Sequence, residues 1–337
     1  MDAILSPPKK RQHVSLRGRI LITILLLLIL ALILFYGFSR LIVLRSFEDL
    51  EQDTTRRDVQ RALYALENDL AGLTTTAADW AQWDDTYTFV QDGNAAYIES
   101  NLTPSTFETL TLNLVVLINQ DGDIVYGQGY DLAAGEIVAL RPEFQAQLTP
   151  GSLLLTHPDT ASKTTGVILL PEGPMLVASL PILTSLDEGP IQGTLIFGRY
   201  LDRAEIARLA HFTYLSIELR QFDEADLPSD FKTAQAALSG DSRTYVSNLS
   251  KQTIAGYALV DDIYGQPSLI LRVELPRSIH QRGQDTVGYF ALLIAVLGLA
   301  FAGASGVILE RWMLARLKRL TDNVQRVGER HDFTGRV

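Results

Sequence analysis

The sequence predicts an α+β domain that lies between two transmembrane helices. Two uncharged apolar runs, at residues 20–39 and 286–309, are each long enough to span a bilayer. Between them, helical periodicity gives way to short apolar runs separated by turn residues, the pattern of a long helix followed by an antiparallel sheet. The expected segments are a cytoplasmic basic tail (1–19), a transmembrane helix (20–39), an extracytoplasmic domain (40–285), a second transmembrane helix (286–309) and a cytoplasmic segment (310–337).

The first apolar run is expected to be a retained anchor. A signal-peptide core has about 7–15 residues and ends at small residues. This run is longer and ends near Tyr36 and Phe38, which suits the aromatic belt at a membrane interface. Buried core helices of a soluble protein are the other explanation of the two runs, but such helices rarely lack charge over this length.

The distribution of charge predicts which side of the membrane each segment faces. Residues 1–45 carry a net charge of +6, residues 46–286 carry −19 and residues 287–337 carry +3. Basic flanks stay in the cytoplasm, so we expect a multi-pass protein of the inner (cytoplasmic) membrane with its acidic domain outside. That acidity excludes a nucleic-acid partner, because the phosphate backbone would be repelled.

The domain is expected to begin with a long helix from about Leu41 to Ala78, with Gly72 a weak point. Its apolar positions step by four and three residues along one face. They are Val59, Leu63, Leu66, Leu70, Leu73, Ala77 and Trp80. This face can pack on the core of the domain, form a dimer seam near the membrane, or do both along different parts of the helix.

Period-two apolar runs predict one antiparallel sheet with helical inserts. The expected strands are 112–118, 123–127, 166–170, 175–182, 193–200, 215–220, 242–247, 254–260 and 268–274. The expected short helices are 93–102, 136–147 and 204–211.

An aromatic and acidic segment directly after the long helix is the first candidate ligand site. It contains Trp80, Trp83, Asp84, Asp85 and Tyr87. Aromatic faces and carboxylates together suit an amine or another cation. The alternative is structural: the tryptophans pack the helix on the sheet and the aspartates cap the next turn.

Arg199 and Tyr200, at the end of a predicted strand and followed by Asp202, are the second candidate. An arginine at a strand end can bind a carboxylate of a ligand through two hydrogen bonds. The alternative is a salt bridge from Arg199 to an aspartate of the aromatic segment, which would join helix to sheet.

Motifs for catalysis, metals and cofactors are missing from the sequence. It has no G-x-S-x-G, no Walker loop and no G-x-G-x-x-G after a strand. It has no cysteine, and its five histidines are scattered without metal-ligand spacing. We therefore expect no catalytic residue, no metal and no cofactor in this chain.

Several segments resemble the extracellular sensor family of the CHASE type, fourth class, over about residues 45–275. They are DWAQWDDTYTFV, YIESNL, LTLNLVVLINQDGDIVYG, GPMLVASLPIL and GTLIFGRYLDRAEIARLA. The resemblance implies a PAS-like fold related to Cache domains, and a place outside the membrane in a prokaryotic receptor.

The segment 310–337 resembles the first half of a HAMP linker. Met313, Leu317, Leu320, Val324 and Val327 step by four and three, as in the seam of a parallel coiled coil. Arg316 and His331-Asp332 stand where HAMP linkers often have Pro and Gly-Asp. The apolar seam needs a partner, which predicts a homodimer.

The sequence as a whole predicts a transmembrane receptor that senses a small ligand, for which a cation is the candidate. The signal would pass by helix motion through the linker to an output domain that this chain does not contain, a diguanylate cyclase, a cyclic-di-GMP phosphodiesterase or a histidine kinase. One alternative is an exported adaptor that binds only proteins, with no pocket behind Trp80 and Trp83. Another is a tethered exported hydrolase.

Overall fold

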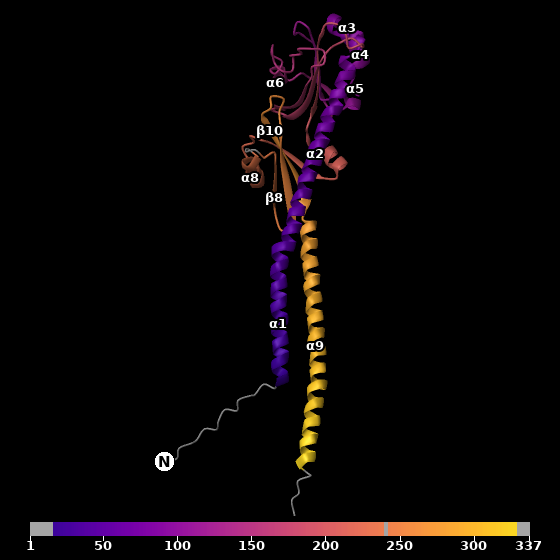
Figure 1. Cartoon of the computed structure of the whole chain (residues 1–337). Coiled ribbons are helices and arrows are strands. Elements are labelled where there is room, and N and C mark those ends of the chain that lie inside the picture. Colours follow the sequence, from indigo (N-terminus) through magenta and orange to yellow (C-terminus); the bar gives the residue numbers. More distant parts are fainter. Residues whose placement is uncertain (1–15, 239–241, 329–337) are drawn as a thin grey trace, which may run out of the picture. The chain divides into compact units, whose positions relative to one another are not determined.

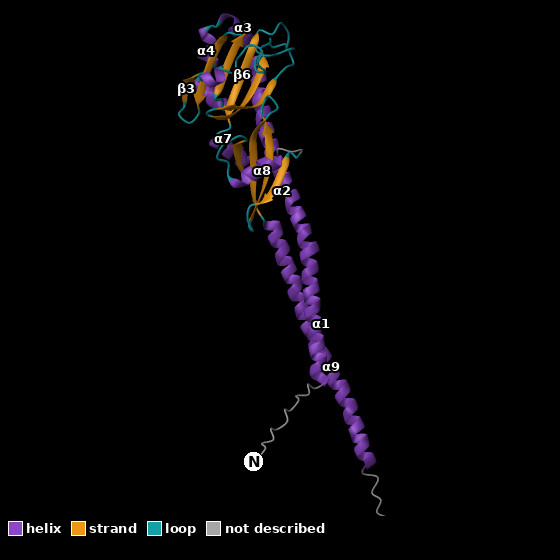
Figure 2. Ribbon diagram, turned by 90° about the vertical axis from the view of Figure 1, so that its left-hand side faces the viewer, coloured by secondary structure: helices purple, strands orange, loops and turns teal. Residues whose placement is uncertain are grey.

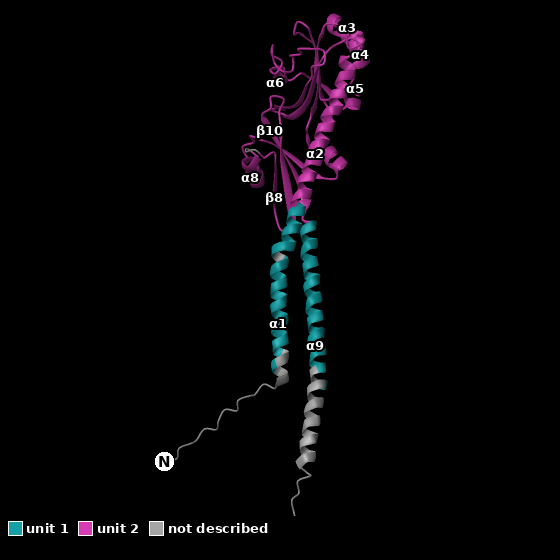
Figure 3. Cartoon of the chain, in the orientation of Figure 1, with its two compact units in different colours: residues 1–51, 278–337 teal, residues 52–277 magenta. Residues whose placement is uncertain are grey.

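The computed structural model describes residues 16–238 and 242–328. The chain divides into two compact units, Met1–Glu51 with Ser278–Val337, and Gln52–Arg277 (Figure 3). The first unit is helical and the second contains all the strands of the described chain.

The first unit contains the two predicted apolar spans, and both are helical. α1 (Leu16–Phe38) continues through a π-helical turn, η1 (Ser39–Val43), into α2 (Leu44–Ala81), which runs on into the second unit (Figure 1). α9 (Ser278–Gly328) carries the second span. Both spans are long and apolar enough to cross a membrane, on length and composition alone. The predicted HAMP seam lies in α9, but its side chains are outside the described residues, as are His331 and Asp332 entirely.

The second unit contains two antiparallel sheets (Figure 2). The first has six strands in the order β3-β2-β1-β6-β5-β4. They are β1 (Leu114–Asn119), β2 (Ile124–Asp131), β3 (Glu136–Ala139), β4 (Thr164–Leu170), β5 (Gly173–Pro181) and β6 (Gly193–Tyr200). The second has four strands in the order β7-β10-β9-β8. They are β7 (Ser216–Gln221), β8 (Thr244–Asn248), β9 (Thr253–Asp261) and β10 (Pro267–Pro276).

Six short helices complete the second unit. They are α3 (Asp84–Asp92), α4 (Ala95–Asn101), α5 (Pro104–Leu110), α6 (Pro142–Gln145), α7 (Arg203–Thr213) and α8 (Ser229–Leu238).

The first sheet is buried on both faces, which explains why β1 is a continuous apolar run. Val115 and Leu117 pack in one hydrophobic cluster. Leu114, Val116 and Ile118 pack in another. Because successive side chains of a strand point to opposite faces, these two clusters lie on opposite sides of the sheet.

One helix, α2, covers a face of both sheets. Leu66, Leu73 and Ala77 pack in the Val115 cluster of the first sheet. One to two turns earlier, Val59 and Ala62 pack on strands of the second sheet. The predicted heptad face of the long helix is therefore its core-facing side. The other face of the second sheet is covered by α8 through Phe231 and Leu238.

The predicted fold class is confirmed: a long N-terminal helix and a PAS/Cache-like antiparallel sheet domain. The helix expected at 136–147 is wrong. Residues Glu136–Ala139 form β3, an edge strand paired with β2, and only Pro142–Gln145 is helical. The division of the strands into two sheets, and the helices α5 and α8, were not predicted.

Candidate functional site

The two tryptophans of the aromatic segment are half-buried and pack against the core of the domain. The Trp80 ring meets Phe197 of β6 edge to face, with centroids 5.7 Å apart. The centroid of the Trp83 ring lies 6.0 Å from that of Tyr97 of α4. These contacts are of the kind that the structural alternative predicts, and a ligand site at this segment stays a prediction.

The acidic residues of the segment organise the chain around α3. The Asp84 carboxylate accepts a hydrogen bond from the Ser185 N–H at 2.9 Å, and the Ser185 hydroxyl accepts one from the Asp84 N–H at 3.1 Å. Asp84 and Asp85 occupy the first turn of α3, where negative charge is favourable. The Tyr87 hydroxyl donates to the Pro190 carbonyl at 3.4 Å.

Arg199 joins the first sheet to α2, but through a different aspartate from the one expected. Its guanidinium binds Asp69 at 2.9 Å and also donates to the carbonyls of Leu110 and Thr111. Asp69 lies in the middle of α2, before the aromatic segment. The expected salt bridge from helix to sheet therefore exists, and the expected partner was wrong.

A buried charge cluster surrounds that salt bridge. Arg208 of α7 binds Asp69 at 2.5 Å and also pairs with Glu205, one turn earlier in α7. Burial opposes ionisation of Asp69, but a hydrogen bond with Glu205 and the charges of Arg199 and Arg208 outweigh it, so the pKa of Asp69 is lowered. Burial raises the pKa of Glu205, and the neighbouring Asp69 carboxylate adds to this. We call Asp69, Arg199, Glu205 and Arg208 the Asp69 cluster.

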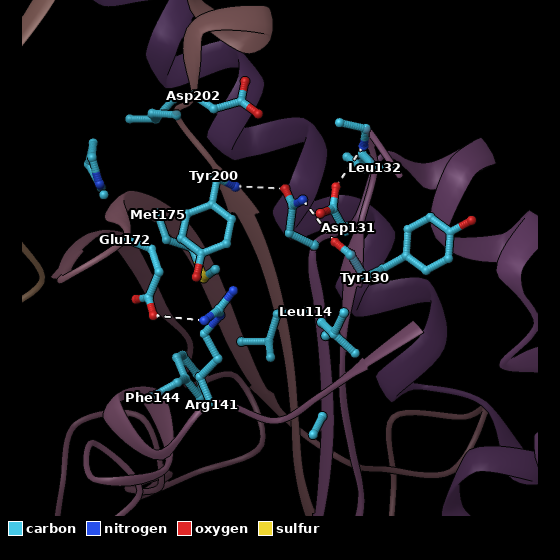
Figure 4. A pocket seen from close by; sticks show the side chains of 18 residues that line it. Leu114, Tyr130, Asp131, Leu132, Arg141, Phe144, Glu172, Met175, Tyr200 and Asp202 are labelled. Carbon is cyan, nitrogen blue, oxygen red and sulfur yellow. Dashed lines mark hydrogen bonds and ion pairs between the residues drawn. The ribbon is translucent and has the colours of Figure 1, made fainter. Parts of the chain in front are cut away.

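A cavity of about 300 Å³ lies against the other face of the first sheet, where strands β1, β2, β5 and β6 have their ends (Figure 4). Its apolar side is formed by Phe144 of α6, Met175 of β5 and Leu114 of β1, all members of the cluster on that face. Tyr200, Asp202, Arg141, Glu172 and Asp131 supply the polar side. Of the predicted site residues, Tyr200 alone lines this cavity.

Three polar groups converge at the cavity. Arg141 and Glu172 form an ion pair at 3.3 Å, with 55% and 24% of their side chains exposed. The Tyr200 hydroxyl points toward this pair (Figure 4). Burial, followed by the negative charge of Glu172, raises the pKa of Tyr200, so its phenol stays protonated and can donate a hydrogen bond.

The other acidic residues at the cavity hold backbone N–H groups. Asp131 accepts from Ala133 and Ala134, at 2.9 and 3.0 Å. Asp202 caps α7 by accepting from the Glu205 N–H at 2.9 Å. Asn113 bridges the ends of β2 and β6, donating to the Tyr130 carbonyl and accepting from the Tyr200 N–H. Within residues 16–238 and 242–328, no group of three or more side chains could hold a metal ion.

Sequence reasoning missed Arg141 and Glu172. Arg141 precedes a proline inside the segment expected to be helical, and Glu172 lies in a Pro-Glu-Gly-Pro turn. Each looks like a solvent-exposed charge of a turn, and only the pairing of strands brings them together.

Comparison with known proteins bears on the part of the chain that holds both the cavity and the Asp69 cluster. Residues 65–220 match the family model of the CHASE4 domain. This part of the chain is similar to CHASE4 domains. The match covers the first sheet, α7 and β7, and ends before most of the second sheet.

One curated relative extends the likeness beyond the CHASE4 domain. The methanogenesis regulatory histidine kinase FilI of Methanothrix harundinacea (strain 6Ac) is 31% identical over 314 residues, which cover 92% of this chain and 34% of that protein. The chain therefore spans about one third of the length of this relative.

Solved structures similar to the chain include two periplasmic domains. The LuxQ domain of Vibrio cholerae is 12% identical, with a TM-score of 0.42, over 66% of this chain and 98% of that one. The sensory domain of the Campylobacter jejuni chemoreceptor Tlp1 is 12% identical, with a TM-score of 0.38, over 71% and 98%. Likeness at this level says nothing about ligand or output.

Proposed function

We propose that this chain is the sensory part of a membrane receptor and that it detects a small ligand in the cavity of its CHASE4 domain. The output of the complete receptor is proposed to be a histidine kinase, on the likeness to FilI. The domain lies outside the inner membrane in this proposal, on the basic flanks of the two spans. The adaptor that binds only proteins stays the alternative, and the cavity on the face opposite Trp80 and Trp83 favours a small ligand.

The observation that carries the proposal is the position of two neighbouring residues on β6. Tyr200 lines the cavity, and Arg199, the preceding residue, binds Asp69 of α2 on the other side of the sheet. A displacement of the end of β6 by a ligand would therefore move a group that holds α2. α2 continues without interruption into the first apolar span through η1.

A second connection runs through α7. Asp202 lines the cavity and caps α7. Glu205 and Arg208 of the same helix complete the Asp69 cluster. Two connections from one cavity thus end on one carboxylate of α2, which makes the Asp69 cluster the coupling element of the proposed receptor. A ligand can shift the Asp69 cluster between two arrangements only if it binds to one of them more tightly than to the other.

The test separates ligand binding from coupling. The full chain in lipid nanodiscs is screened by thermal shift against amino acids, amines, carboxylates and sugars. Hydrogen exchange of α2 around Asp69 is then measured with and without each compound that binds. Val138→Trp fills the cavity, because the register of β3 on β2 and β1 places Val138 on the same face as Leu114; the exposed Ala95→Trp on α4 is its control. Asp69→Asn and Arg208→Gln remove charge from the Asp69 cluster without touching the cavity.

We expect Val138→Trp to abolish binding while Ala95→Trp leaves it unchanged. Asp69→Asn and Arg208→Gln should keep binding but lose the change in exchange of α2. Binding that survives Val138→Trp would show that the cavity is not the site. An unchanged α2 response in both cluster variants would show that coupling takes another route.

A further inference from the structure

We infer that the ligand of this cavity is a zwitterion in which one carbon carries both the ammonium and the carboxylate, as in an α-amino acid. The inference rests on the proposed function of the cavity and names the chemical class that it recognises. Its basis is the Arg141–Glu172 pair, the fixed role of the other acidic residues and the apolar wall opposite them.

Four charged side chains line the cavity, three acidic and one basic, and only Arg141 and Glu172 among them form an ion pair with each other. Asp131 and Asp202 are held by backbone N–H groups of their own turns. Arg141 and Glu172 make one contact at 3.3 Å and are partly exposed, so each keeps hydrogen-bonding capacity. A ligand that carries only a positive charge would oppose Arg141, and one that carries only a negative charge would oppose Glu172. A ligand with both charges satisfies both residues.

The spacing of the pair sets the spacing of charges in the ligand. When a zwitterion lies antiparallel to the pair, its carboxylate meets Arg141 and its ammonium meets Glu172, giving four charges of alternating sign. This ring closes only if the ligand's charged groups are about as close together as those of the protein, whose nearest nitrogen and oxygen atoms are 3.3 Å apart. Two groups on one carbon meet that condition, whereas groups at the ends of a chain do not.

The rest of the cavity suits an apolar side chain of modest size. Phe144 and Met175 are each 2% exposed and form its wall. The Tyr200 phenol can donate a further hydrogen bond to a carboxylate near the pair. A volume of about 300 Å³ lies at the lower end of the range for ligand sites, which fits a molecule of amino-acid size.

Four probes separate charge from shape. L-Leucine has both charges on one carbon, isopentylamine is leucine without its carboxylate, and isocaproate is leucine without its ammonium. ε-Aminocaproate is an isomer of leucine with its charges at opposite ends. Binding of each to the full chain in nanodiscs is measured by calorimetry. We expect leucine to bind at least about tenfold more tightly than the other three.

Two variants should change the preference in opposite directions. Glu172→Gln leaves Arg141 and should bind isocaproate more tightly than leucine. Arg141→Gln leaves Glu172 and should bind isopentylamine more tightly than leucine. Arg243→Gln, in another exposed ion pair at 2.8 Å with Asp261, is the matched control and should bind as the wild type does.

Every other outcome contradicts either the ligand class or the proposed function of the cavity. If isopentylamine, isocaproate or ε-aminocaproate binds as well as leucine, the zwitterion class is wrong. If none of the four binds but another compound does and Val138→Trp abolishes that binding, the class is wrong and the proposed function stands. If binding of every compound survives Val138→Trp, the proposed function itself fails.

Discussion

At the scale of single residues, Asp69 of α2 holds together three elements of the domain. Its side chain is 9% exposed and lies between Arg199 of β6 and Arg208 of α7. A buried charge is tolerated only when it is paired and hydrogen-bonded. Removing Asp69 leaves Arg199 with carbonyl acceptors only and Arg208 with Glu205 only, so the cluster fixes how α2 meets the sheet.

Asp69→Ala should lower the free energy of unfolding of the full chain by about 3–5 kcal/mol, because it leaves the guanidiniums of Arg199 and Arg208 without their shared partner. Asp53→Ala on the same helix is the control. Asp53 pairs with Arg56 at 2.8 Å, but both side chains are about half exposed or more. Such a pair is worth less than about 1 kcal/mol. Denaturant titration measures both, and equal losses would contradict the assigned role.

His157 makes the stability of the domain depend on pH. Both of its ring nitrogens are buried without a hydrogen-bond partner among the described residues. Burial lowers the pKa of His157 to about 4 from 6.5. Because the folded state keeps the ring neutral, the domain has its full stability above pH 6.5. It loses stability as the pH falls from 6.5 to about 4, where the unfolded state takes up a proton and the folded state does not.

His157→Leu should therefore flatten the fall in melting temperature between pH 7 and pH 4. The exposed His211→Leu controls for the loss of a histidine. Thermal unfolding followed by circular dichroism at a series of pH values measures the slope. An unchanged slope in His157→Leu would show that the ring is protonated in the folded state.

At the scale of elements, the contact of α2 with the second sheet is unusually close. Gly256 of β9 has room for no side chain: a Cβ there would lie 2.4 Å from Val59 and 2.9 Å from Thr55. Val59 is fully buried and β-branched, so it cannot rotate away. The glycine therefore sets the distance between helix and sheet.

Gly256→Ala should destabilise the chain by about 1–3 kcal/mol through overpacking. Gly72→Ala in α2 is the matched control, because a Cβ at that position would have no atom within 4 Å. That change should stabilise the chain by about 0.5–1 kcal/mol, since alanine favours the helix. Thermal unfolding distinguishes the two, and a neutral Gly256→Ala would show that the helix can shift at no cost.

At the scale of the whole molecule, α2 links features that lie far apart in the sequence. It packs on both sheets and continues through η1 into the first apolar span. The two sheets also meet directly, where the Ile263 N–H donates to the Val167 carbonyl of β4. A change at the first sheet therefore has a continuous helical connection to the first span, as the proposed receptor requires.

The absence of cysteine allows a direct test of topology in cells. Thr160→Cys, on an exposed loop of the second unit, should react with a membrane-impermeant maleimide in intact cells. Ser6→Cys, in the basic tail, should react only after the cells are opened, because basic flanks stay inside. Labelling of Ser6→Cys in intact cells would reverse the predicted orientation. The homodimer predicted from the HAMP-like seam stays a prediction.

Most of the strands and the long helix could be predicted because their signals are local. The predicted strand 193–200 coincides with β6, and the predicted helix 204–211 lies within α7. The segment 136–147 was misjudged because β3 is an exposed edge strand whose partner, β2, supplies the hydrogen bonds that make it a strand. Periodicity in one segment carries no information about such a partner.

The sequence by itself determined the two apolar spans, the acidity of the domain between them, the α+β class and the CHASE-type resemblance. Each depends on composition or on residues near one another in the chain. The contacts on which the proposed site depends come from the tertiary structure alone. Trp80 and Trp83 pack, half-buried, against the core, and Arg199 binds Asp69 rather than the aromatic segment. Arg141 and Glu172 meet at the cavity because strand pairing, which is non-local, brings distant turns together.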